Sequence, residues 1–170
     1  MNEQKIDVLE IRLVWNKYEQ WDEGTDENPV YKMIQGISYY INGISLLDMI
    51  REVEAPYCEA EECPELTASY ALNSKEVMRR QFKWALDSNS FFYKEGIGLF
   101  CCEACFMICC WSVFCKIREE GDFILMTDFY HNHRDWIYPF AFRFTKENFF
   151  AELKKLEIST QDAGGTADEQ

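Results

Sequence analysis

The segment from residue 99 to residue 115, LFCCEACFMICCWSVFC, holds six of the chain's eight cysteines and one charged residue, Glu103. Its 17 residues fall just short of the roughly 20 apolar residues that a membrane-spanning helix needs. Cysteine is a small apolar side chain that is commonly buried. The segment therefore predicts hydrophobic core, with a central strand over residues 108–118. Strand alternation would place four side chains on one face: Cys109, Trp111, Val113 and Cys115.

Two chemical uses of the same thiols remain as alternatives. Cys102 and Cys105 form a Cys-x2-Cys pair, and Cys58 and Cys63 are a looser second pair, so a structural zinc site with four sulfur ligands can be drawn. The pair lacks the glycine that usually lets backbone amides turn toward metal-bound sulfur. A redox dithiol would use Cys102 and Cys105 and would need a basic neighbour to lower a thiol pKa. Glu103 lies between them and acts in the opposite direction.

The hydropathy pattern predicts an α+β fold with a mostly antiparallel sheet of about five or six strands and three helices packed on it. Residues 7–16 alternate between apolar and polar, as does the segment 30–41, and we expect these two strands to pair as a hairpin. Helices are expected after three capping residues: Ser45, Ser74 and Thr145. Pro56 is expected to end the first helix.

The same pattern predicts one domain over residues 1–158, followed by a disordered acidic tail over residues 159–170. Further strands are expected over three segments and a short fourth: residues 97–104, 108–118, 122–129 and 139–144. Residues 56–72 show no regular pattern, and we expect a long connection there.

The charge balance predicts the kind of partner. The chain has 30 acidic and 17 basic residues and a formal net charge of −13, so nucleic acids and anionic membranes would be repelled and a basic protein attracted. Two acidic segments, at 21–28 and 52–65, are the candidate binding surface, with Trp21 and Tyr57 as aromatic anchors. The candidate acidic contacts are Asp22, Glu23, Asp26, Glu27, Glu59, Glu61 and Glu62.

The two histidines lie in the aromatic segment DFYHNHRDWIYPF, residues 128–140. His131 and His133 would point the same way on a strand, which suits metal binding with Asp128 or Asp135 as a third ligand. A Cys–His nucleophile pair can also be drawn. The interpretation we favour is that these histidines orient a loop by hydrogen bonding. No phosphate-binding loop or hydrolase motif accompanies them.

Three segments resemble a group of small, uncharacterised bacterial proteins: YYINGISLLDMI, the Cys-Cys-Trp at 109–111, and HRDWIYPFAFRFTKENFFAEL at 133–153. In that group an Ile-Asn-Gly segment opens a helix, a Cys-rich turn ends in Cys-Trp, and a His-Arg-x-x-Trp-x-Tyr element precedes a Phe-rich strand and a last helix. The resemblance spans about residues 38–155, although other residues replace the glycines of the Cys-rich turn here. It implies no particular activity.

These observations favour a non-enzymatic binding protein, specifically a bacterial immunity protein that neutralises a basic, nuclease-type toxin by occluding its active site. No cofactor or resident metal is expected in this interpretation. The start MNEQKIDVLE lacks the basic and apolar stretches of a signal peptide, which favours a cytoplasmic chain with reduced thiols. The alternatives are a structural zinc or thiol-redox domain built on the cysteines of residues 101–115, and a hydrolase or transferase built on His131 or His133.

Overall fold

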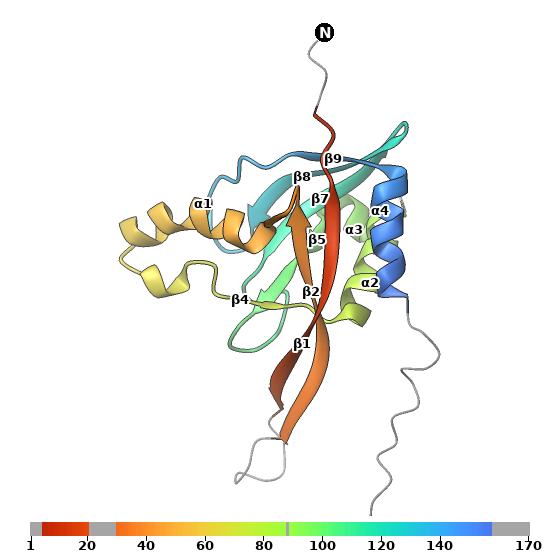
Figure 1. The fold of residues 1–170 in the computed structure, drawn as a ribbon. Helices are drawn as coiled ribbons and strands as arrows, with labels where there is room; N and C mark the ends of the chain where they lie inside the picture. Colours follow the sequence, from red (N-terminus) through yellow and green to blue (C-terminus); the bar gives the residue numbers. More distant parts are fainter. Residues whose placement is uncertain (1–4, 21–29, 88, 158–170) are drawn as a thin grey trace, which may run out of the picture.

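The fold is the α+β architecture that the sequence predicts (Figure 1). The structure, a computed structural model, describes residues 5–20, 30–87 and 89–157. Its strands in these ranges are β1 (Leu9–Gln20), β2 (Val30–Ile41), β3 (Ile44–Ser45), β4 (Tyr70–Leu72), β5 (Ile97–Gly98), β6 (Phe100–Cys102), β7 (Val113–Glu120), β8 (Phe123–His131) and β9 (Phe142–Thr145). Its helices are α1 (Leu46–Ala60), α2 (Lys75–Ala85), α3 (Phe91–Glu95) and α4 (Lys146–Leu153), with 3-10 turns η1 (Pro64–Leu66) and η2 (Lys154–Leu156).

The strands form three antiparallel sheets rather than one, and they outnumber the five or six predicted. The sheet orders are β1-β2-β3, β4-β6 and β5-β7-β8-β9. The strand predicted over 97–104 divides at Leu99, because β5 pairs with β7 whereas β6 pairs with β4. The backbone N–H of Leu99 donates to the carbonyl of Val113 at 2.9 Å. Leu99 therefore joins the four-stranded sheet to the two-stranded sheet, in which Cys101 and Cys102 pair with Ala71 and Tyr70 of β4.

The long β1-β2 hairpin confirms the predicted pairing, with Leu9 opposite Ile41 and Trp15 opposite Gln35. Burial changes along the hairpin. Leu9 and Ile41 are buried, whereas Trp15 and Met33 are 62% and 55% exposed. The backbone of β1 and β2 extends beyond the helices that cover the hairpin (Figure 1). Residues on the apolar face of one strand therefore differ in burial because the hairpin is longer than the layer it packs on.

An aromatic core joins the hairpin to the two helices on one side of the molecule (Figure 1). The ring of Tyr39 on β2 packs edge-on against Phe82 of α2 and Phe100 of β6, with centroids 6.3 and 6.0 Å apart. Phe82 in turn packs against Phe149 of α4 at 5.9 Å. Both phenylalanines are at most 1% exposed, and truncating such a side chain to alanine costs about 3–5 kcal/mol.

The three predicted helix starts are confirmed. Ser45, Ser74 and Thr145 each accept a hydrogen bond from the backbone N–H three residues later. The predicted end of the first helix is wrong, because α1 continues through Pro56 to Ala60. Pro56 lies inside the helix and is exposed, on the side of α1 that faces away from the core.

The predicted strand over 108–118 is also wrong in its first half. Residues 103–112 form a loop, and β7 begins at Val113. Cys109 is exposed in this loop, whereas Cys115 is fully buried in β7. The expectation that the cysteines fill the core therefore holds for Cys101 and Cys115 but not for the loop cysteines. Among the described residues, no helix is long and apolar enough to cross a membrane.

Candidate functional site

The acidic residues after Arg51 occupy three environments. Residues 51–66 contain six glutamates, of which Glu54 is fully buried and Glu61 forms an ion pair with Arg134 at 3.2 Å. The other four are exposed, and none of them makes a salt bridge with a residue in the described ranges. We call these four the acidic edge: Glu52, Glu59, Glu62 and Glu65. The last turn of α1 carries no basic residue, so the negative end of the helix dipole adds to this potential.

Tyr57 and Glu61, predicted as partner contacts, make internal contacts beside the acidic edge. The Tyr57 ring stacks on Trp136 with centroids 5.7 Å apart, and its hydroxyl accepts a hydrogen bond from the backbone N–H of Ile137 at 3.3 Å. The Trp136 indole donates to Glu61 Oε1 at 2.9 Å. These contacts hold the loop on α1 and leave the Ile137 side chain 73% exposed. The predicted residues Trp21, Asp22, Glu23, Asp26 and Glu27 lie outside the described residues.

The buried carboxylate of Glu54 also connects the elements of this region. Glu54 Oε1 accepts hydrogen bonds from the hydroxyls of Tyr70 and Tyr138 at 2.5 and 2.6 Å, and its Oε2 accepts one from the backbone N–H of Ala68 at 2.8 Å. Burial raises the pKa of Glu54, and the three donors partly oppose that rise. The arrangement connects α1 to β4 and to the loop before β9, so Glu54 is a structural residue rather than part of the acidic edge.

One of the two histidines, His131, makes a hydrogen bond of the loop-orienting kind that the sequence favours. His131 lies at the end of β8, is 3% exposed, and accepts the backbone N–H of His133 at its Nδ1 at 3.0 Å. Burial, with smaller contributions from the positive charges of Arg134 and His133, lowers the pKa of His131 to about 4. A neutral, buried ring whose Nδ1 is already occupied is a poor general base at neutral pH. Asp128, drawn as a third metal ligand, lies 3.6 and 3.8 Å from the cationic groups of Arg118 and Lys116.

Trp111 connects the histidine loop to the Cys-rich loop. Its ring packs edge-on against His131 with centroids 4.2 Å apart, and the Arg134 guanidinium lies 5.0 Å above it. The same guanidinium lies 5.9 Å from the Trp136 ring. The Cys-Trp and His-Arg-x-x-Trp-x-Tyr segments, distant in sequence, therefore form one aromatic cluster beside the end of α1.

The Cys-rich loop brings three thiols together. The Sγ atoms of Cys102, Cys105 and Cys110 all lie within 4.8 Å of one another, and we call them the thiol cluster. The turn between the first two closes when the backbone N–H of Phe106 donates to the carbonyl of Cys102 at 2.8 Å. Cys102 is half-buried, and the other two are exposed. Cys58 and Cys63, predicted as a second ligand pair, are not in this cluster.

The thiols interact with one another and with backbone N–H groups. Burial acts to raise the pKa of Cys102, but hydrogen bonds from the backbone of Cys105 and Ala104 and from the neighbouring thiols lower it overall. The shared hydrogen bonds with Cys105 and Cys102 raise the pKa of Cys110 to about 11. Glu103 does not approach the thiols in this arrangement, because its carboxylate accepts a hydrogen bond from the Ser69 hydroxyl at 2.9 Å.

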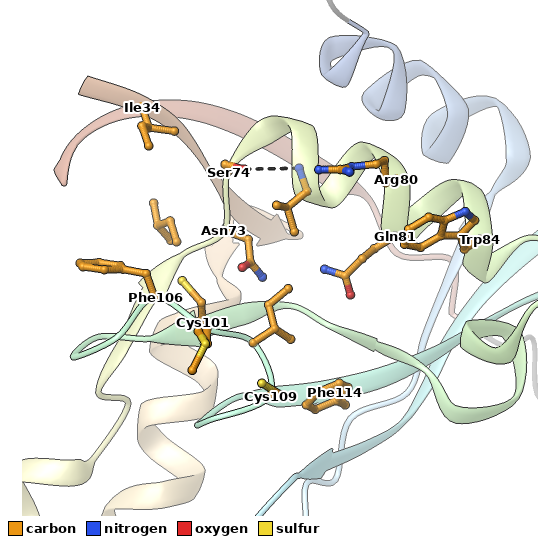
Figure 2. Close-up of a pocket in the computed structure, with 14 residues that line it drawn as sticks. Ile34, Asn73, Ser74, Arg80, Gln81, Trp84, Cys101, Phe106, Cys109 and Phe114 are labelled. Carbon is orange, nitrogen blue, oxygen red and sulfur yellow. Dashed lines mark hydrogen bonds between the residues drawn. The ribbon is translucent and has the colours of Figure 1, made fainter. Parts of the chain in front are cut away.

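A cavity of 680 Å³ lies between the Cys-rich loop and α2 (Figure 2). Phe106 and Cys109 line it from the loop side, and Trp84 lines it from α2. Four side chains that carry amide, hydroxyl or guanidinium groups line it: Asn73, Ser74, Arg80 and Gln81. The Asn73 amide at 3.0 Å, and Gln81 through both its oxygen and its nitrogen, are hydrogen-bonded to the backbone of Gly98. The Ser74 hydroxyl caps α2, and the Arg80 guanidinium lies 3.5 Å from the Glu76 carboxylate. The cavity is therefore mostly apolar, and each of these four side chains already has a partner among the residues that the structure describes.

No family model, no curated protein and no solved structure matches this chain. The resemblance of its Ile-Asn-Gly, Cys-Trp and His-Arg-x-x-Trp-x-Tyr segments to a bacterial group therefore stays a prediction. The arguments for function below depend on the geometry of the chain itself.

Two features of the site escaped the sequence reasoning. Glu54 was counted with the surface acids, although it follows Leu46 and Ile50 at intervals of four residues and so falls on the buried stripe of α1. The third member of the thiol cluster, Cys110, was assigned to a strand because residues 108–115 are apolar. No periodic signal in that segment distinguishes a loop from a buried strand.

Proposed function

We propose that this chain is a non-catalytic, acidic binding protein that acts as a bacterial immunity protein and occludes the cationic active site of a basic, nuclease-type toxin. The observation that carries the proposal is the acidic edge. Four exposed glutamates without ionic partners in the described ranges lie along and just beyond the end of one helix, where the dipole makes extra negative charge unfavourable. A cationic partner would relieve that repulsion.

The neighbourhood of the acidic edge supports binding as well as steering. Steering by charge raises the association rate, whereas stable complexes also need a desolvated anchor. Ile137 is largely exposed, and its backbone is held by the Tyr57 hydroxyl above the Tyr57–Trp136 stack. We therefore assign the acidic edge to steering and Ile137 to the centre of the contact.

The place of action proposed for the chain is the cytoplasm of the cell that makes the toxin. Inhibition there requires no chemistry by this chain, because covering the toxin's cationic site excludes its nucleic acid substrate. The eight cysteines are free thiols in the structure, which is consistent with a reducing compartment.

The experiment compares two charge-reversed variants that have equal net charge. Glu59→Lys with Glu62→Lys alters the acidic edge, and Glu95→Lys with Glu120→Lys alters exposed positions elsewhere. The candidate partners are any basic proteins encoded next to this chain's gene. For one that binds the chain, the association and dissociation rate constants are measured by surface plasmon resonance at low and high salt.

The acidic-edge variant is expected to associate at least about 10-fold more slowly, to dissociate at nearly the wild-type rate, and to lose most of the salt dependence. The control variant should lose much less of the association rate. Equal losses in the two variants would show that only net charge matters, and an unchanged association rate in the acidic-edge variant would refute the assigned surface.

A further inference from the structure

We propose that the thiol cluster, Cys102, Cys105 and Cys110, is a binding site for one soft divalent cation of the Zn²⁺ class, with three thiolate ligands and a fourth position open to solvent. Zinc in proteins is bound by cysteine sulfur at about 2.3 Å in a tetrahedral arrangement. Three sulfur atoms that all lie within 4.8 Å of one another need only small side-chain rotations to surround such an ion. The site is independent of the acidic edge.

The backbone already has the form of a metal-binding turn. The backbone N–H groups of Ala104 and Cys105 act on the Cys102 thiol in the direction that lowers its pKa, and donors of this kind orient a sulfur ligand and offset its negative charge. The turn closes through the hydrogen bond from Phe106 N–H to the Cys102 carbonyl. A second backbone hydrogen bond closes the loop: the N–H of Cys102 donates to the carbonyl of Met107 at 3.2 Å.

Phe106 explains how the turn forms without the glycine that such turns usually contain. Its φ is +56°, a left-handed conformation that costs a bulky residue about 1–2 kcal/mol. The chain adopts this conformation immediately after Cys105, at the position that directs the backbone back toward Cys102. The lack of a glycine in this turn argues against a metal site when only the sequence is considered. In the structure Phe106 takes the left-handed conformation that such a glycine would take.

The surroundings favour a metal over a redox pair. No lysine or arginine is among the groups that act on the Cys102 or Cys110 thiols, whereas a reactive thiolate in a redox pair depends on such a neighbour. Three converging thiols also exceed the two that a disulfide exchange needs. Binding would replace three S–H bonds by three Zn–S bonds and release the thiol protons to solvent, with no change of oxidation state.

The consequence for the fold is local. A bound ion would fix residues 102–110, which form one wall of the apolar cavity, and would hold Trp111 against His131. We therefore assign the ion a structural role in ordering the Cys-rich loop.

The test uses full-length reduced protein, prepared without oxygen and freed of metal with a chelator, and titrates it with Zn²⁺ against a chromogenic competitor. Wild-type protein is expected to bind one Zn²⁺ per chain. Cys102→Ser, Cys105→Ser and Cys110→Ser should each weaken binding at least about 10-fold. Cys109→Ser is the matched control, because Cys109 is exposed in the same loop but outside the cluster, and it should bind as wild type does.

A second readout identifies the ligands directly. Cobalt-loaded wild type and Cys109→Ser should show the intense sulfur-to-cobalt charge-transfer absorption, and Cys110→Ser should show a reduced band. Near-ultraviolet circular dichroism of each metal-free variant separates loss of a ligand from loss of the fold. The proposal is overturned if reduced wild type takes up no zinc, if Cys102 and Cys105 form a disulfide in place of binding it, or if Cys109→Ser weakens binding as much as Cys110→Ser.

Discussion

Buried His131 predicts a specific loss of stability in acid. The folded chain holds the ring neutral with a pKa of about 4, against 6.5 for a free histidine, because burial opposes the charged form. Below 6.5 the unfolded chain therefore takes up a proton that the folded chain refuses, so stability falls as the pH falls from 6.5 to about 4. At 1.36 kcal/mol for each pKa unit, the full loss is about 3 kcal/mol, of which about 2 kcal/mol is reached near pH 5.

The assay is urea unfolding followed by tryptophan fluorescence at about pH 8 and about pH 5. His131→Gln removes the titrating ring, so its unfolding free energy should fall by about 2 kcal/mol less than that of wild type between these two conditions. His133→Gln is the control, since this neighbouring ring is exposed. It should keep most of the wild-type pH dependence, because burial and Arg134 lower the pKa of His131 more than His133 does. The reasoning is refuted if His131→Gln and wild type lose the same stability on acidification.

Two further substitutions test the buried carboxylate and a tight backbone approach. Glu54→Gln leaves one oxygen where two accept three hydrogen bonds, so it should lower the unfolding free energy by about 2 kcal/mol. The exposed Glu52→Gln should stay within about 0.5 kcal/mol of wild type. Burial raises the pKa of Glu54, so the contribution of Glu54 to the unfolding free energy is greatest in acid and is lost as the pH rises through its folded-state pKa. Equal thermal melts for Glu54→Gln and Glu52→Gln would contradict a stabilising role of this hydrogen-bond network. Gly96 has a φ of +97°, and a Cβ there would lie 2.5 Å from the Cys115 carbonyl oxygen, so Gly96→Ala should cost about 3 kcal/mol or more by chemical denaturation. Gly121→Ala, also left-handed but with nothing within 4 Å, should cost only about 1 kcal/mol, and similar costs at both glycines would show that the close approach does not matter.

The parts of the fold that the sequence predicts are those with a local physical cause. Alternation in residues 7–16 and 30–41 identifies the hairpin strands, and Ser45, Ser74 and Thr145 identify helix starts through their own side-chain oxygens. The exposure of Trp15 and Met33 in this hairpin is not predictable in this way. It depends on how far the neighbouring layer extends, which is a tertiary property.

The parts that the sequence does not predict depend on residues whose chemistry allows two environments. A cysteine in an apolar segment fits either a core strand or an exposed loop. Cys115 is buried in a strand, whereas Cys110 is exposed in a loop. The glutamates of α1 have the same side chain, yet only Glu54 among them falls on the buried face of the helix. There it accepts hydrogen bonds from the hydroxyls of Tyr70 and Tyr138. The division of the cysteine segment at Leu99 between two sheets likewise depends on pairing with distant strands.

The central claim is that this chain acts by presenting the acidic edge and Ile137 to a basic partner. Hydrogen–deuterium exchange of the chain, alone and saturated with the basic protein that binds it in the surface plasmon resonance experiment, tests that claim most directly. The account predicts new protection of the amides in residues 58–66 and 136–138, with exchange at the turn of residues 119–123 unchanged. Protection confined to that turn, or to the open side of the apolar cavity, would contradict it.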